Sequence, residues 1–441
     1  MKVLLVSPAV DPTAKTNKQM RMPQLALIIL GGLTPREHQV VAIEEEAEDI
    51  DLEQDCDLVG ISFMTSNASR AYRLAGEFKK RGKTVVMGGV HPTLLPDEAL
   101  RYGDSVVIGE AEGVWAELLE DFRNGRLKRT YQNPRPDLSI HVPKDFSKVI
   151  KRSLFSVVPL MTSRGCPYAC DFCCVSDLYG REIRHVPVDI VVRDIKESGA
   201  KMFMFLDDNI VGDPRYAREL FAALKPLKVS WGGQSSLSLL VKDEELLRLA
   251  VESGCTGLFI GLESVKEAQM NSLRKSFGSL RGMEEALRKV NKAGIFVVAS
   301  MIFGFDDDTK DVFDDTVKFL IKNGLHTATF NVLTPYPGTK TLRRMKEQGR
   351  LLTDDWKYYD HSTVVFQPKN MSARELMEGK VRARKKFYGS RSILRRFPAN
   401  VRHPLIYMAM NWGHVKAVRV EERRLAQVER ELYETGANGR P

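Results

Sequence analysis

The stretch TSRGCPYACDFCCVSDL (Thr162–Leu178) holds four of the six cysteines of a 441-residue chain. Cys166, Cys170 and Cys173 within it have the spacing C-x3-C-x2-C. A thioredoxin-like redox pair needs only C-x-x-C and would leave Cys166 without a role. A [4Fe–4S] cluster takes four ligands, usually all thiolates, so three cysteines on one loop would leave one iron open for another ligand. The spacing therefore favours an iron–sulfur site.

The remaining cysteines bear on the choice of metal. Structural zinc usually takes two pairs of ligands, but Cys56 and Cys255 each stand alone in the sequence. Cys174 directly follows Cys173, and two adjacent residues reach one cluster only with awkward geometry. We therefore expect Cys174 to pack in the fold rather than to bind metal.

Residues 152–345 alternate short apolar runs with amphipathic helical patterns. The first of six such runs is SVVPLMTSRGCP and the last is TATFNVLTPYPGT. Six strand–helix units predict a partial (β/α)6 TIM-like barrel, a fold whose chemistry lies on the loops that follow the strands. The cysteines directly follow the first strand, which is where a catalytic group belongs.

Residues 1–130 alternate in the same way. Buried-strand patterns such as MKVLLVSPA and DLVGISFMT are followed by helical patterns, which predicts an α/β domain with a doubly wound, flavodoxin-like parallel sheet. Ligands of such sheets bind beyond the carboxyl ends of the strands. A tight turn would explain one loop of small residues, but three such loops together favour a ligand site. The candidate residues are Ser62, Thr65, Ser66, Gly88, Gly89, His91, Gly109 and Glu110.

The composition is ordinary for a globular protein, with 43% hydrophobic and 28% charged residues. MKVLLV at the start is too short for the apolar region of a signal peptide. The sequence has no apolar run of about 18 residues that could span a membrane. With few cysteines and no export signal, we expect a cytoplasmic protein.

The two remaining segments have distinct compositions. Residues 131–151 are rich in Pro, Asp and Lys and predict a linker, whereas residues 346–441 predict a mainly helical, basic region. Much of the net charge of +9 falls in Lys380–Phe397. A solvated helical face is one explanation of that run. The alternatives are binding to nucleic acid, to an anionic membrane surface or to an acidic substrate. The apolar stretch Ala399–Trp412 predicts a docking helix, with a peripheral membrane contact as the alternative.

The cysteine motif, with Phe172 before its last cysteine and a barrel strand before the loop, resembles the radical S-adenosylmethionine (SAM) enzymes. In that family the open iron is chelated by the amino and carboxylate groups of SAM. An electron from the cluster then cleaves SAM to methionine and a 5′-deoxyadenosyl radical. The resemblance implies that Cys166, Cys170 and Cys173 are the cluster ligands.

The resemblance continues at the ends of later strands. FLDDN (Phe205–Asn209) ends the second strand, where the family holds the methionine amino group, and GLES (Gly261–Ser264) ends the fourth. A helix cap would explain Asp208 alone, and a surface loop would explain Glu263 alone. The ordered set favours SAM binding instead. The implied SAM-binding residues are Asp207, Asp208, Asn209, Glu263 and Ser264.

The first 130 residues resemble the cobalamin-binding domain that precedes the barrel in the B12-dependent branch of this family. GISFMTSN, GGVHPT and GEAEG resemble the loops around the corrin and its nucleotide tail. Many B12 domains carry D-x-H-x-x-G after the first strand, and that histidine ligates cobalt from below. Here the strand leads into SPAVDPTAKTNKQM, which has no histidine, so we expect cobalamin without a histidine lower ligand. His91, a lone loop histidine, is a candidate polar contact only.

Together, these cofactors imply radical C-methylation, through methylcobalamin, of an unactivated carbon of a small molecule such as a lipid, terpenoid, tetrapyrrole or secondary metabolite. An oxidative cyclase of the bacteriochlorophyll type uses the same cofactors and stays an alternative. The implied partners are the substrate and an electron donor such as flavodoxin or ferredoxin. No residue stands out as an acid or base acting on the substrate.

Two further alternatives fit the sequence less well. The tRNA methylthiotransferases carry a second cluster on three N-terminal cysteines and a terminal β-barrel domain, whereas here the first domain has only Cys56. We therefore expect no nucleic-acid partner. A non-enzymatic cobalamin sensor would have no need of three cluster thiolates.

Overall fold

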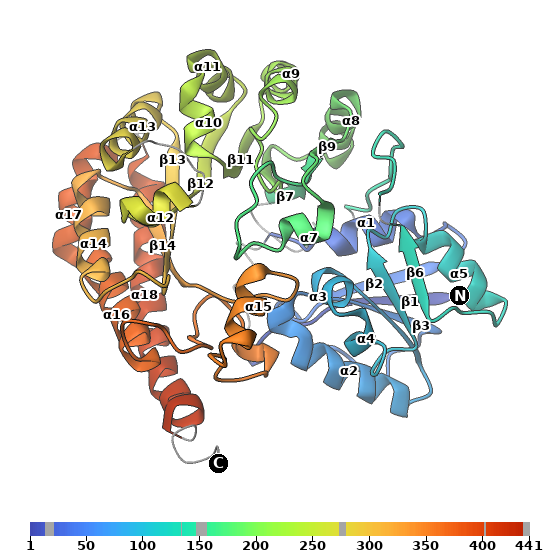
Figure 1. Cartoon of the computed structure of the whole chain (residues 1–441). Helices are drawn as coiled ribbons and strands as arrows, with labels where there is room; N and C mark the ends of the chain where they lie inside the picture. Colours follow the sequence, from blue (N-terminus) through green and yellow to red (C-terminus); the bar gives the residue numbers. More distant parts are fainter. Residues whose placement is uncertain (14–21, 134, 147–156, 273–278, 401–402, 435–441) are drawn as a thin grey trace.

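Two six-stranded parallel sheets form the core of the molecule and lie side by side in Figure 1. The computed structural model describes the chain except for residues 14–21, 134, 147–156, 273–278, 401–402 and 435–441. The first sheet belongs to the N-terminal part of the chain, and the second belongs to the predicted barrel. Both predicted sheets are confirmed.

The first sheet has the strand order β2-β1-β3-β4-β5-β6, and all its neighbours are parallel. The order reverses between β1 and β3, which leaves a crevice beyond their carboxyl ends. Its strands are β1 (Lys2–Ser7), β2 (Gln39–Glu44), β3 (Leu58–Ser62), β4 (Thr84–Gly88), β5 (Ser105–Gly109) and β6 (Thr130–Asn133). Its helices are α1 (Leu25–Leu33), α2 (Ala68–Lys80), α3 (Val90–Leu94), α4 (Pro96–Ala99) and α5 (Trp115–Arg123).

Helices cover both faces of the first sheet because its strands are apolar on both sides. Leu4 and Val6 pack into one core with α2, while Val3 and Leu5 pack into another with α1 and α5. Successive side chains of a strand point to opposite faces, so the apolar run of β1 serves both cores. The sheet extends past residue 130, because the polar strand β6 pairs with β5 inside the predicted linker.

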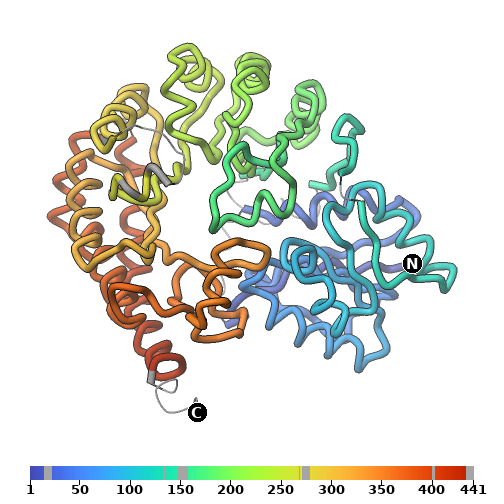
Figure 2. The backbone as a smooth tube through the Cα atoms, viewed as in Figure 1, coloured from blue at the N-terminus to red at the C-terminus, as the bar shows by residue number. Residues whose placement is uncertain are grey.

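The second sheet has the sequential order β7-β10-β11-β12-β13-β14, again with parallel neighbours. Figure 2 shows its backbone as an open arc with helices on the outside. Its strands are β7 (Val157–Leu160), β10 (Met202–Phe205), β11 (Ser230–Ser235), β12 (Cys255–Glu263), β13 (Phe296–Phe303) and β14 (Thr327–Val332). Its helices are α8 (Val188–Ser198), α9 (Pro214–Leu224), α10 (Leu237–Lys242), α11 (Glu244–Glu252), α12 (Glu267–Ser272), α13 (Leu280–Ala293), α14 (Val312–Lys322) and α15 (Lys340–Glu347).

The C-terminal helices α16 (Ala373–Phe387), α17 (Ser390–Arg396) and α18 (Pro404–Val428) pack on the last barrel units. A Cβ atom at Gly379 of α16 would lie 2.2 Å from the Phe313 ring of α14, so only glycine permits this close approach. The Tyr388 hydroxyl donates to the Ala328 carbonyl oxygen of β14 at 2.6 Å. This region therefore continues the barrel core instead of forming a separate body. Among the helices that the structure describes, none has the length and apolar character needed to cross a membrane.

Candidate functional site

The cysteine loop runs from the short strand β8 (Ser163–Arg164) to α7 (Val175–Tyr179). Strand β8 pairs antiparallel with β9 (Arg184–His185), which closes the loop at its base. The Cys173 amide donates to the Cys170 carbonyl oxygen at 3.0 Å, which turns the backbone between these two cysteines. All three motif cysteines are half-buried. Their thiols form a sulfur-only donor set on one tight loop, and such a set suits an iron–sulfur cluster.

Two aspartates that follow β10 hold the base of this loop. Asp207 is fully buried and accepts hydrogen bonds from the Thr162 hydroxyl at 2.7 Å, the Thr162 amide at 3.1 Å and the Ser163 hydroxyl at 2.6 Å. Asp208 accepts one from the Gly165 amide at 3.2 Å, and burial raises its pKa to about 6. Their side chains brace the backbone before Cys166. The contact of Asp207 and Asp208 with SAM stays a prediction.

Asn209 leaves a donor unused. It is buried, and its Oδ1 accepts a hydrogen bond from the Ser236 amide at 3.0 Å. Its Nδ2 has no hydrogen-bond partner within the described part of the chain. A buried donor without a partner costs about 1–3 kcal/mol, so this atom is suited to meet a polar group of a ligand. The Ser236 hydroxyl also lies 3.2 Å from the Tyr168 hydroxyl of the cysteine loop.

Glu263 ends β12 in an unusual backbone conformation. Its φ is +65°, in the left-handed region, and the register with β13 shifts between Gly261 and Glu263. Such strain at a non-glycine residue occurs at sites where a side chain must be aimed. Glu263 and Ser264 are both buried, and the Ser264 hydroxyl accepts from the Lys266 amide at 3.1 Å.

A cavity of about 490 Å³ lies between the first sheet and the cysteine loop. Strand ends β1, β3, β4 and β5 form one wall, and residues from the barrel side form the other. The predicted residues that line it are Ser62, Ser66, Gly88, Gly89, Gly109 and Glu110. The barrel side contributes Met161, Arg164, Leu178, Tyr179 and Leu206. We call this space the inter-sheet cavity.

Gly89 shapes the wall of the inter-sheet cavity. Its φ is +99°, and a Cβ atom there would lie 2.8 Å from the Phe63 carbonyl oxygen. Only glycine therefore lets the loops after β3 and β4 pack together. The resulting small-residue wall at the sheet's reversal point suits a broad, flat ligand.

His91 and Thr65 lie behind this wall and do not line the cavity. GGVHPT forms the helix α3 where the sequence predicts a loop, and the His91 ring is fully buried. Its Nε2 lies 3.0 Å from the Tyr72 hydroxyl and its Nδ1 lies 3.3 Å from the Thr65 hydroxyl. The Trp356 ring packs edge-on against it at 5.3 Å. His91 thus belongs to the packing between the first sheet and the C-terminal region.

A buried ion-pair network at the cavity joins the loop after β5 to the β8–β9 hairpin that closes the cysteine loop. Arg164 pairs with both Glu110 and Glu112, and Arg184 also pairs with Glu110. Burial lowers the pKa of Arg164 to about 10 and raises the pKa of Glu112. Sequence reasoning missed Arg164, Glu112 and Arg184. The sequence did offer a hint of this network: an arginine two residues before Cys166 and the two glutamates of GEAEG.

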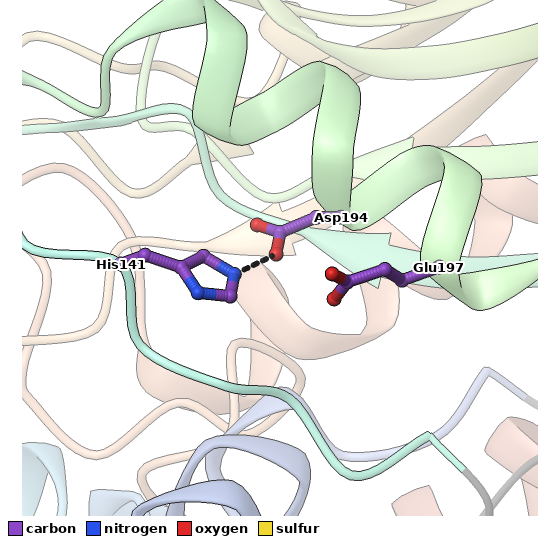
Figure 3. A group of neighbouring side chains, drawn as sticks. All are labelled: His141, Asp194 and Glu197. Atoms are coloured by element: carbon purple, nitrogen blue, oxygen red, sulfur yellow. Dashed lines mark hydrogen bonds and ion pairs between the residues drawn. The ribbon is translucent and has the colours of Figure 1, made fainter.

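A second group of potential metal ligands lies between α8 and residue His141. Figure 3 shows His141, Asp194 and Glu197, with a hydrogen bond between the first two. Asp194 is buried, and its second carboxylate oxygen pairs with the Lys144 ammonium at 2.6 Å. Because that ammonium already balances the carboxylate charge, this cluster fastens residues 141–144 to α8.

Comparisons with known proteins agree with this geometry. The family model described as the radical SAM superfamily matches residues 160–320, and that of the B12 binding domain matches residues 21–119. A bacteriochlorophyllide d C-12(1)-methyltransferase of Chlorobaculum tepidum is 32% identical over 410 residues, which cover 90% of this chain and 89% of that protein. The bacteriochlorophyllide d C-8(2)-methyltransferase of the same organism is 30% identical over 371 residues, covering 80% and 82%.

A solved structure has the same fold. The radical SAM methyltransferase TsrM from Kitasatospora setae, with cobalamin and a [4Fe–4S] cluster bound, superimposes with a TM-score of 0.66 and 14% identity. The match covers 97% of this chain and 99% of that one.

The three-cysteine loop, the barrel and the matching relatives define a radical SAM enzyme. More narrowly, the chain belongs to the cobalamin-dependent branch of that superfamily, among its methyltransferases. Its cofactors are a [4Fe–4S] cluster, SAM and cobalamin, and its substrate is a small molecule.

Proposed function

We propose that this enzyme transfers a methyl group to an unactivated carbon of a tetrapyrrole. In this proposal the cluster and cobalamin act in one chamber, and one observation supports that arrangement. Arg164, two residues before Cys166, lines the inter-sheet cavity together with Glu110 and Glu112 of the first sheet. A cluster on the cysteine loop and a cofactor in that cavity would therefore share one wall.

The chain's own residues have separate tasks in this proposal. When bound, the cluster and SAM supply a 5′-deoxyadenosyl radical and cobalamin carries the methyl group. Cys166, Cys170 and Cys173 would hold the cluster, and Asp207 and Asp208 would keep their loop in place.

The remaining predicted residues would bind the two organic cofactors. Asn209 Nδ2, which has no partner among the described residues, would donate to SAM. Glu263 and Ser264 would contact SAM from the end of β12. The lining residues of the inter-sheet cavity would surround the corrin: Ser62, Ser66, Gly88, Gly89, Gly109 and Glu110. His91 and Thr65 would support this wall from behind.

We further propose a division of the chain into a cobalamin-binding domain of residues 1–133 and a barrel that begins at β7. The first boundary moves from residue 130 because β6 completes the first sheet. The segment 134–156 would connect the two. Residues 346–441 would count as part of the barrel unit, because α16 shares its core.

The choice of a tetrapyrrole among the small-molecule classes rests on the two bacteriochlorophyllide methyltransferases. They align along most of this chain, through both cofactor domains and beyond. An electron donor such as flavodoxin or ferredoxin would reduce the cluster. The basic C-terminal region would contact a membrane surface.

The cluster assignment is tested by replacing Cys170 and its neighbour Cys174 in parallel. Anaerobically reconstituted Cys170→Ala should lose cluster iron and produce no 5′-deoxyadenosine from SAM. Cys174→Ala is the matched control, since the two thiols lie four positions apart on one loop, and it should keep both. Equal loss of iron in the two variants would contradict the assignment.

The reaction type and the substrate are tested by mass spectrometry. With cobalamin, SAM, a reductant and bacteriochlorophyllide d as the probe, the wild type should yield a product heavier by one methylene unit. It should also yield S-adenosylhomocysteine and 5′-deoxyadenosine. A product that has lost hydrogen without S-adenosylhomocysteine would favour the cyclase-type alternative. Deoxyadenosine with an unchanged probe would contradict the tetrapyrrole assignment alone.

A further inference from the structure

The first half of α18 presents apolar side chains to solvent. Leu405, Ile406, Met408 and Trp412 are 84%, 51%, 50% and 65% exposed, and Leu394 on the neighbouring α17 is 71% exposed. Five of the 13 exposed large apolar residues in the described part of the chain thus fall within 19 positions. Such clustering on a surface marks an interaction site. We call these five residues the apolar face.

The spacing along α18 separates an inner side from an outer side. Leu405, Met408 and Trp412 follow the i, i+3, i+7 pattern of one helix face. Tyr407, Asn411 and Val418 point the other way and are buried. The helix is therefore fixed to the barrel by one side, and the apolar face on its other side has no covering element among the described residues.

The two helices that carry the apolar face are held rigidly together. The Tyr407 hydroxyl donates to the Ile393 carbonyl oxygen at 2.7 Å. Arg396 is buried and donates to Asn411 Oδ1 at 3.0 Å and to the Leu325 carbonyl oxygen at 2.8 Å. Figure 1 shows α17 at the edge of the molecule farthest from the first sheet. The face is thus preformed on a stable platform.

The stretch of sequence that carries the apolar face is basic. Residues 379–420 contain 11 Lys and Arg residues and no Asp or Glu. Some of these cations are neutralised from elsewhere, as in the pairs of Lys380 and Arg384 with Glu421. Four of the 11 are exposed and make no ion pair with any described residue: Arg391, Arg395, Lys416 and Arg419. The Lys416 ammonium lies 6.0 Å from the centre of the Trp412 ring.

We propose that the apolar face is a docking surface for an anionic lipid membrane, into whose interface Leu405, Met408 and Trp412 insert. A helix with exposed Leu and Trp flanked by Lys and Arg lies in the plane of a membrane interface. The four unpaired cations add attraction to anionic headgroups.

Other occupants fit the same residues less well. A second copy of the chain on a twofold axis would bring two sets of Arg391, Arg395, Lys416 and Arg419 together at one interface, with no acid in this segment to balance them. Nucleic acid would meet the cations but would leave the aliphatic side chains without a partner. The proposal concerns binding and is independent of the methyl transfer reaction.

The test is co-flotation of the purified full chain with vesicles of phosphatidylcholine, with or without phosphatidylglycerol. Wild-type protein should float only with the phosphatidylglycerol vesicles, and added salt should weaken binding. The variant R391Q/R395Q/K416Q/R419Q should bind about tenfold or more weakly. A matched control, R248Q/R281Q/R288Q/K289Q, removes four exposed cations from α11 and α13 and should bind like the wild type.

Tryptophan fluorescence reports insertion, because Trp115 and Trp231 are buried, Trp356 is half-buried against the first sheet, and Trp412 alone of the four is exposed. Anionic vesicles should shift the emission of the wild type to shorter wavelength, and Trp412→Phe should abolish the shift. Equal flotation with neutral vesicles, no flotation at all, or equal weakening in the control variant would overturn the proposal. So would a concentration-dependent dimer in light scattering that Trp412→Ser dissociates.

Discussion

The barrel meets the rest of the chain through two contacts of opposite character. On one side, the first sheet has two cores of its own, and among the described residues of its helices only Ile28 reaches the barrel's core. The rest of that contact includes the Arg164 and Arg184 ion pairs, the inter-sheet cavity and the packing of Trp356 on His91. On the other side, α16 and α18 share one continuous apolar core with the barrel. A contact built from charges around a cavity can open and close for a ligand, whereas a shared core cannot separate without unfolding.

The largest expected effect comes from the apolar contact. Phe387 of α16 is fully buried against Phe330 of β14. Phe387→Ala should lower the free energy of unfolding by about 3–5 kcal/mol, because it leaves a cavity in the shared core. Urea denaturation would measure this loss. The exposed Leu394→Ala is the control and should change stability by less than about 0.5 kcal/mol. If Phe387→Ala left the stability of both α16 and the barrel unchanged, the shared core would be disproved.

The ionic contact should respond more locally. Arg164→Gln leaves the buried Glu112 without its partner, at a cost of roughly 3 kcal/mol. Hydrogen exchange should accelerate in β8, β9 and residues 109–112, while the cores of both sheets stay protected. Arg135→Gln is a matched control, because Arg135 and Glu182 also form an ion pair at 3.1 Å but are exposed; it should change little. The second substitution Glu112→Gln should recover part of the loss, and no recovery would contradict this account.

Stability should depend on pH with a defined sign at the contact between the barrel and the C-terminal helices. Asp308 accepts from the Gly304 and Phe305 amides, and burial raises its pKa from 3.8 to about 6. The folded state therefore retains a proton that the unfolded state loses, so this contribution is present below pH 3.8 and is lost as pH rises through 6. Relative to Asp308→Asn, the wild type should lose about 2 kcal/mol between pH 4 and 7 in urea denaturation.

A neighbouring aspartate should show the opposite slope. Burial acts to raise the pKa of Asp306, but Lys369 and Arg350 outweigh it and lower the pKa. Its stabilisation is therefore present at neutral pH and lost as pH falls through the folded pKa. The same slope for Asp306→Asn and Asp308→Asn would contradict both assignments.

The smallest expected effect lies where the C-terminal region touches the first sheet. The Trp356 indole donates to Glu98 at 2.8 Å. Trp356→Phe should lower stability by only about 1 kcal/mol, because Glu98 keeps its hydrogen bond from Tyr72 at 2.9 Å. A thermal melt checks this, with the exposed Trp412→Phe as the control. A loss as large as that of Phe387→Ala would remove the distinction between the two sides of the barrel.

Periodicity and motif spacing were sufficient to predict both sheets and the cysteine loop, because apolar runs and cysteine spacing are local signals. The ion-pair network was not predictable in this way, since Arg164 meets partners 54 and 52 positions away. Strand β6 was missed because its sequence TYQN is polar at the sheet's edge. His91 was placed in a loop, but its segment forms a helix that buries the ring. Contacts between distant elements leave no periodic trace in a single sequence.

The two-walled cavity also constrains how the active protein is made. A chain emerging from the ribosome completes the first sheet at Asn133, before Met161, Arg164 and Leu206 of the second wall have been synthesised. A cofactor held between both walls gains its full set of contacts only after the barrel has folded. If cobalamin binds in this cavity as proposed, its loading would be a late step of maturation, and a cell short of the vitamin would accumulate folded chains that await it.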